Sequence, residues 1–138
     1  MQCCQSYRDI PAETGQAVEK GKGMMETTIE LKVTTGKFHE LYQTLQALLP
    51  TIRKEKGCLD CRIFRDIEDG EVFFLTVEWD TKENFEEYAR SGNCSALLGA
   101  IDLLSAEARI RFGHESAWEG IDSLKRIRKD ASILSPQR

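Results

Sequence analysis

The sequence predicts a single α+β domain with an antiparallel sheet that carries its helices on one face. The chain has 138 residues, which is enough for one domain and short for two. Apolar residues make up 41% of it, an ordinary share for a globular protein. Segments with the period of a strand or of a helix follow one another in the order strand, helix, strand, strand, helix, strand.

The first strand and the first helix are the clearest elements. Across residues 27–34 apolar and polar side chains alternate, which predicts a half-buried strand. Across residues 37–54 apolar side chains recur at the helical period and form one continuous stripe. Pro50 lies inside this pattern, so we expect an irregular last turn. Gly57 is expected to end the helix.

A hairpin is predicted next, from strands at residues 58–65 and 71–79. Asp69 and Gly70 are expected to form its turn, because these residues tolerate the positive φ of such turns. Both faces of the second strand are apolar. One face carries Phe73, Leu75, Val77 and Trp79, and the other carries Val72, Phe74 and Thr76. Since helices cover only one face, we expect a second subunit to bury the other in a two-fold homodimer.

The second half of the fold repeats the pattern. Asp80 or Thr81 is expected to cap a helix whose buried face carries Phe85 and Tyr88. Residues 91–93 interrupt it, a second helical piece follows, and residues 108–114 form the last strand. This order is the split βαβ arrangement of the ferredoxin-like fold, with a four-stranded antiparallel sheet.

Three regions are expected along the chain. Residues 1–23 are predicted to be a poorly ordered arm, because they hold few large apolar residues and several glycines. Residues 24–115 are predicted to be the folded domain. Residues 116–138 are predicted to be a helical extension that docks on its own or on a partner subunit. Its apolar residues recur at three-residue steps, at Trp118, Ile121, Leu124 and Ile127.

Charge and composition exclude several kinds of partner. The formal net charge is −4, so nucleic acid is not expected as the main partner. No apolar run approaches the roughly 18 residues of a membrane span, and no secretory signal is evident. We therefore expect a cytoplasmic protein without a membrane partner, in which the five cysteines remain thiols. The basic residues Lys125, Arg126, Arg128 and Lys129 are interpreted as a solvated helix end, with an anionic contact left open.

The cysteine and histidine patterns do not predict a metal site. Cys58 and Cys61 form a C-x-x-C pattern, but residues three apart in a strand point to opposite faces. Neither a second pair of cysteines nor a spaced pair of histidines accompanies them. His39 lies off the apolar stripe of its helix and is expected in solvent. His114 is either a structural residue or part of a cavity wall.

An aromatic set remains, and most of it is interpreted as core. Trp79 and Tyr88 differ, because each carries a polar tip that needs a partner when buried. Glu78 stands beside Trp79 at the end of a strand. A pocket between sheet and helices that gathers an indole N–H, a phenol and a carboxylate would suit a flat aromatic ligand. The residues expected to contact that ligand are Phe64, Phe74, Glu78, Phe85 and His114.

Short motifs in the chain resemble those of the antibiotic biosynthesis monooxygenase family. The motifs are Gly57-Cys58-Leu59, Arg65-Asp66, Phe74-Leu75, and Glu78-Trp79 followed by Thr81 and Phe85. The resemblance spans about residues 27–112. It implies a ferredoxin-like dimeric α+β barrel with a pocket between sheet and helices in each subunit. It also implies oxidation of quinols or polycyclic phenols by dioxygen, with no cofactor.

The resemblance further implies roles for three residues. Trp79 and Tyr88 would orient the ring, and Asn93 would polarise an oxygen. Quinol-oxidising relatives commonly have histidines where this chain has Tyr88 and Asn93, and haem-degrading relatives have one in the region of Leu98. We interpret the chain as a monooxygenase of a small quinol-like or polycyclic phenolic molecule. A non-catalytic ligand-binding or sensory dimer on the same fold is the alternative.

Overall fold

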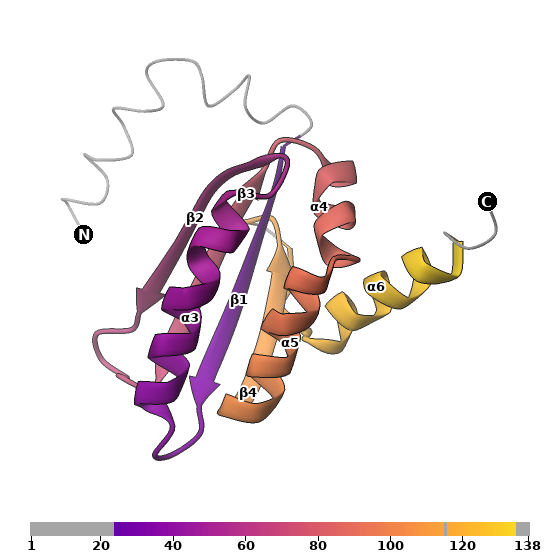
Figure 1. The fold of residues 1–138 in the computed structure, drawn as a ribbon. Coiled ribbons are helices and arrows are strands. Elements are labelled where there is room, and N and C mark those ends of the chain that lie inside the picture. The colour runs from indigo at the N-terminus through magenta and orange to yellow at the C-terminus, as the bar shows by residue number, and fades with distance from the viewer. Residues whose placement is uncertain (1–23, 115, 135–138) are drawn as a thin grey trace, which may run out of the picture.

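A five-stranded antiparallel sheet forms one layer of the structure, and helices α3, α4 and α5 form the other (Figure 1). The computed structural model describes residues 24–114 and 116–134. The predicted arm at residues 1–23 lies outside the described residues. The strand order is β2-β3-β1-β4-β5. The α+β class and the ferredoxin-like order of the first six elements are confirmed, and the sheet has one strand more than predicted.

The helices and strands lie close to their predicted positions. Their bounds are β1 Met25–Val33, α3 Phe38–Arg53, β2 Cys58–Arg65, β3 Val72–Trp79, α4 Lys82–Ala89, α5 Gly92–Leu104, β4 Ser105–Phe112, β5 Glu119–Gly120 and α6 Asp122–Leu134. Helix α3 runs through Pro50 to Arg53, and Gly57 follows with a positive φ of 87°. A Cβ at Gly57 would lie 2.5 Å from the Cβ of Asn84, so only glycine fits where the chain turns into β2.

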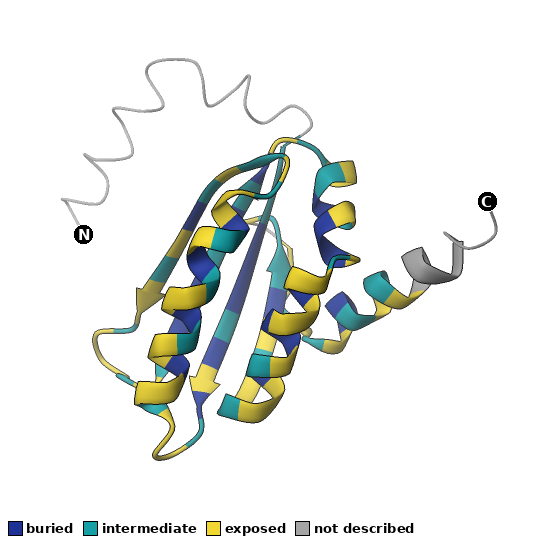
Figure 2. Ribbon diagram, viewed as in Figure 1, coloured by how far each residue is buried: buried dark blue, intermediate teal, exposed yellow. Residues whose placement is uncertain are grey.

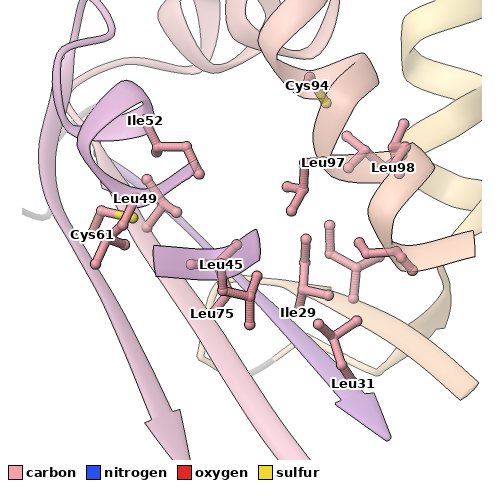
Figure 3. Close-up of a cluster of buried hydrophobic side chains, with 14 of the residues drawn as sticks. Ile29, Leu31, Leu45, Leu49, Ile52, Cys61, Leu75, Cys94, Leu97 and Leu98 are labelled. Atoms are coloured by element: carbon pink, nitrogen blue, oxygen red, sulfur yellow. The ribbon is translucent and has the colours of Figure 1, made fainter. Parts of the chain in front are cut away.

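The core lies between the sheet and the three helices (Figure 2). Alternate residues of β3, from Phe73 to Trp79, are at most 5% exposed and point toward the helices. Leu41, Leu45 and Leu49 come from α3 to meet them. Figure 3 shows the centre of this cluster, where Cys61 of β2 and Cys94 and Leu97 of α5 join the aliphatic side chains. Burial of this one face supplies the main stabilisation of the fold.

The other face of the sheet is apolar only over β2 and β3. Phe64 and Phe74 are register partners there, and Phe64 is 50% exposed. Over β1 and β4 this face is polar: Glu30 pairs with Arg109 at 2.7 Å. Trp118 packs on the guanidinium groups of Arg109 and Arg111. The apolar part is therefore smaller than the sheet itself.

The turn between β2 and β3 differs from the prediction. Gly70 does not adopt a positive φ. Instead, the Oδ1 atom of Asp66 accepts hydrogen bonds from the backbone N–H groups of Glu68 and Asp69. The carboxylate organises the turn, so no left-handed residue is needed.

The C-terminal extension is helical only from Asp122. Glu119 and Gly120 form β5 by pairing with Ile110 and Arg109 of β4, which removes Trp118 from the predicted helix. Helix α6 packs against α4 of the same chain, and Leu124 is 2% exposed. The prediction that this segment docks is confirmed, on its own subunit. In the described part of the chain no helix is both long and apolar enough to cross a membrane.

The three glycines Gly36, Gly57 and Gly99 give a graded test of the fold. Gly36→Ala strains a positive φ in open space and is expected to lower the free energy of unfolding by about 1–2 kcal/mol. Gly57→Ala adds the clash with Asn84 and should cost more. Gly99→Ala lies in α5 with open space and should raise stability by roughly 0.5–1 kcal/mol. Urea unfolding checks the ranking, and equal effects of all three changes would contradict it.

Candidate functional site

Trp79, Phe85 and Tyr88 meet at the end of β3. Trp79 is the last residue of that strand and points inward. Thr81 caps α4 at once, with its Oγ1 atom accepting from the backbone N–H of Asn84 at 3.1 Å. Helix α4 therefore begins directly after the end of β3. Phe85 and Tyr88, on its buried face, pack against the indole ring of Trp79. The ring centroids of Trp79 and Tyr88 lie 5.2 Å apart, and those of Trp79 and Phe85 lie 6.1 Å apart.

Both polar tips of this cluster are buried without an oxygen or nitrogen hydrogen-bond partner, although the Tyr88 hydroxyl lies beside the Cys94 thiol. They are the Nε1–H of Trp79, which is 1% exposed, and the hydroxyl of Tyr88, which is 5% exposed. An unpaired buried polar group costs about 1–3 kcal/mol. Indole nitrogen can only donate, and a neutral phenol also donates. Both groups can therefore donate to an acceptor oxygen that enters the cluster.

Three thiols surround Tyr88 and all remain protonated at neutral pH. Burial raises the pKa of Cys94 to about 11, and the Arg128 guanidinium and the Tyr88 hydroxyl beside the thiol offset this only in part. Burial also raises the pKa of Cys61, to about 12, and that of Cys58. Burial likewise raises the pKa of Tyr88 above its ordinary value, with Cys94 as the next cause. Neither the phenol nor the thiols can act as a base at neutral pH.

The prediction that Cys58 and Cys61 point to opposite faces is wrong. The β2–β3 register shifts between Cys58 and Asp60, so Cys58 lies opposite Trp79 and Cys61 opposite Val77. A bulge adds one residue to β2 there, and this residue is Leu59, which is 51% exposed. Both thiols thus face the core. Among the described residues no group of three or more His, Cys, Asp and Glu side chains is arranged to hold a metal ion.

The pocket predicted around Trp79 does not gather all of the expected residues. Glu78, Phe64 and Phe74 lie on the opposite face of the sheet, because side chains alternate along β2 and β3. His114 lies beyond β4, 81% exposed, with its Nε2 atom 2.7 Å from Oε1 of Glu26. The predicted carboxylate partner of the indole and the phenol is therefore absent. Of the residues expected to contact a ligand, only Phe85 joins Trp79 and Tyr88.

Asn93 also lies outside the aromatic cluster. It is exposed near the start of α5, and its Nδ2–H donates to Oε2 of Glu55 at 2.5 Å. Both residues line an open surface hollow of about 350 Å³ with Pro50, Thr51, Lys54 and Lys56. A second hollow, of about 540 Å³, lies between α3 and β2. Neither Trp79 nor Tyr88 lines either hollow. The two hollows therefore give no access to the buried aromatic cluster.

Sequence reasoning missed Cys94 as a neighbour of Tyr88, and Arg128 as a neighbour of Cys94. Cys94 follows the cap residue Ser91, whose Oγ accepts from its backbone N–H at 3.2 Å. Arg128 stands four residues after buried Leu124, on the same side of α6. The four-residue spacing between Leu124 and Arg128 is the sequence feature that could have indicated this inward position of Arg128. The interpretation of Lys125 and Arg128 as a solvated helix end is corrected, because both make contacts within the chain.

The raised thiol pKa values predict a loss of stability at high pH. Above pH 9 the unfolded chain releases the protons of Cys61 and Cys94, whereas the folded chain keeps them until about pH 11–12. Unfolding then releases protons, so the free energy of unfolding falls as pH rises, by about 1.4 kcal/mol per pH unit for each group. Urea unfolding between pH 7 and 10.5 measures this slope. The double variant Cys61→Ala with Cys94→Ala should show a flatter slope, and identical slopes would refute the assignment.

Comparison with known proteins places this fold in a family. The model of the antibiotic biosynthesis monooxygenase family matches residues 24–98. No curated protein sequence matches the chain. Similar solved structures include a conserved protein from Methanosarcina mazei Go1, with 18% identity and a TM-score of 0.62, covering 67% of this chain and 93% of that one.

Two further structures have the same fold. PA3566 from Pseudomonas aeruginosa has 19% identity and a TM-score of 0.61, covering 69% of this chain and 96% of that chain. A structure named antibiotic biosynthesis monooxygenase has 14% identity and a TM-score of 0.60, covering 67% of this chain and 99% of its own. At these identities the structures show the fold alone. Since the family model matches more than half of the residues, the chain belongs to the antibiotic biosynthesis monooxygenase family.

Proposed function

We propose that this protein is a cofactor-independent monooxygenase of a quinol-like or polycyclic phenolic substrate. The observation that carries the proposal is the pair of buried, unpartnered donors at Trp79 and Tyr88. They would hold one oxygen of a flat ring that packs against the two aromatic side chains and Phe85. Membership of the family supports the reaction type.

The reaction needs few protein groups besides these two donors. A deprotonated phenolic ring is rich enough in electrons to reduce dioxygen. In an anthrone, the ring CH₂ carbon loses two hydrogens and gains one oxygen atom of dioxygen, and the second oxygen atom leaves as water. In a quinol, one ring C–H becomes C–OH, and the two hydroxyl hydrogens leave with the second oxygen atom as water. The indole N–H and the phenol O–H would stabilise the ring anion, and hydrogen bonds to charged groups contribute about 1.5–3 kcal/mol each. The dry surroundings strengthen both bonds.

A non-catalytic ligand-binding or sensory dimer is the second candidate, and one observation favours it. The phenol and the thiols next to Trp79 hold their protons at neutral pH, so they offer no base. The charge of the Glu55 carboxylate affects Tyr88, but its Oε2 atom accepts a hydrogen bond from Asn93. A substrate would then have to enter as its anion. A binding protein needs no such step.

Removing one donor at a time tests the function. Trp79→Phe and Tyr88→Phe should each lower kcat/KM for oxygen uptake with reduced naphthoquinones or anthrone by about 10- to 100-fold. The matched controls are Trp118→Phe and Tyr42→Phe, because Trp118 packs on the far face of the sheet and Tyr42 is 47% exposed on α3. Oxygen-electrode measurements on metal-stripped protein provide the rates.

The outcome separates the two candidates. Uptake that depends on both donors supports the monooxygenase. A rise in Tm with a naphthoquinone or anthrone, without oxygen uptake across the panel, supports the binding protein. Neither uptake nor a rise in Tm, from a folded protein, would overturn both.

We also propose that two copies of the chain pair through the uncovered sheet face. Phe64 and Phe74 form the apolar part of that face, and half of Phe64 is exposed in the single chain. A second copy would remove this surface from water. The dimer also agrees with the barrel that the family resemblance implies.

Sedimentation tests the dimer. The unchanged protein should sediment as a dimer at micromolar concentration, and Phe74→Arg should shift it to a monomer, because the charge would be buried without a partner. The control is Leu103→Arg, at a residue that is 78% exposed on the helix layer, where no change is expected. A monomeric unchanged protein would refute this pairing.

A further inference from the structure

Helix α6 lies outside the part of the chain that the family model matches. The family model ends at residue 98, and the similar structures cover 93–99% of their own lengths but only 67–69% of this chain. Yet α6 is part of the packed fold, beside α4 and α5 (Figure 1). Leu124 is 2% exposed, and Nζ of Lys125 lies 3.1 Å from Oδ1 of Asp102 in α5. This helix is therefore placed to act on the neighbouring site.

Arg128 ties α6 to the junction between α4 and α5. Its Nη1–H groups donate to the carbonyl oxygen of Ala89 at 2.7 Å and to that of Ser91 at 2.9 Å. Ala89 is the last residue of α4, and Ser91 caps α5. The carbonyl group of Ala89, at the C-terminal end of α4, carries partial negative charge and binds a guanidinium well. The carbonyl group of Ser91 also accepts the first hydrogen bond of α5, from the backbone N–H of Ser95 at 3.2 Å.

The candidate site lies directly behind this junction. The thiol of Cys94, which is 0% exposed, has the Arg128 guanidinium and the Tyr88 hydroxyl beside it. Tyr88 itself is the residue before Ala89, whose carbonyl Arg128 holds. Trp79 and Tyr88 are buried, so a ligand reaches them only if the segments that cover them move.

We propose that Arg128 is a positioning residue that clamps the α4–α5 junction, fixes Tyr88, and keeps the site closed until α6 moves away. The clamp itself is independent of any reaction. Only its purpose, the admission of a ligand, rests on the proposed function. The match to the family model ends before α6, so this control belongs to the C-terminal extension of this chain.

Alkylation of Cys94 by iodoacetamide in the full chain measures the opening. A fully buried thiol reacts only when its surroundings open. Arg128→Gln removes the charged donor and should raise the labelling rate of Cys94 by about 10- to 100-fold. Arg128→Lys keeps the charge and should restore part of the protection. Lys129→Gln, at the exposed neighbour, should leave the rate unchanged.

Cys61 serves as an internal control, because it lies on β2 and is also buried. Peptide mass spectrometry separates the two thiols. Faster labelling of Cys94 alone supports the clamp. An unchanged Cys94 rate in Arg128→Gln overturns it, and so does an equal rise at both cysteines, which would report loss of global stability.

The unchanged protein gives a second measurement if Arg128→Gln does not fold. Labelling of Cys94 in low urea should depend less on urea concentration than labelling of Cys61, because a local opening exposes less surface than global unfolding. Equal urea dependence would overturn the proposal. Neither experiment uses a ligand, so either can fail while the donor variants still support the proposed function, and the reverse also holds.

Discussion

Burial of one face of the sheet under α3, α4 and α5 is the constraint on which the rest of the structure depends. Because side chains alternate along β3, placing Phe73, Leu75 and Val77 in the core also places Trp79 there. The same alternation sends Phe74 and Glu78 to the opposite face. The composition of the candidate site is thus a consequence of packing. It contains an indole and a phenol, and the carboxylate of Glu78 lies outside it.

The aromatic cluster departs from the usual rule that buried polar groups are paired. Trp79 and Tyr88 leave two donors unsatisfied, although the surrounding core is otherwise filled by aliphatic side chains and thiols. Burial keeps the phenol and the thiols neutral, which favours donation over proton abstraction. The site is therefore better suited to hold an anionic or carbonyl oxygen than to create one.

The C-terminal extension packs on the rest of the fold in two places. On the outer face, Trp118 covers Arg109 and Arg111 before the chain pairs with β4. On the helix layer, Leu124 joins the core and Arg128 binds the carbonyl groups between α4 and α5. One segment thus contacts both layers of the domain, which links the C-terminal part of the chain to the helices around Tyr88.

The amino-acid pattern alone determined the α+β class, the order of the first six elements and the inward position of Trp79, Phe85 and Tyr88, because these follow from short-range periodicity. The tertiary structure decided the features that depend on pairing between distant segments. These are the bulge that turns Cys58 inward with Cys61, the short strand β5, and the reach of Arg128 to Ala89 and Ser91. The spacing of residues along the chain does not reveal these features, because each arises from backbone groups that meet only after the chain has folded.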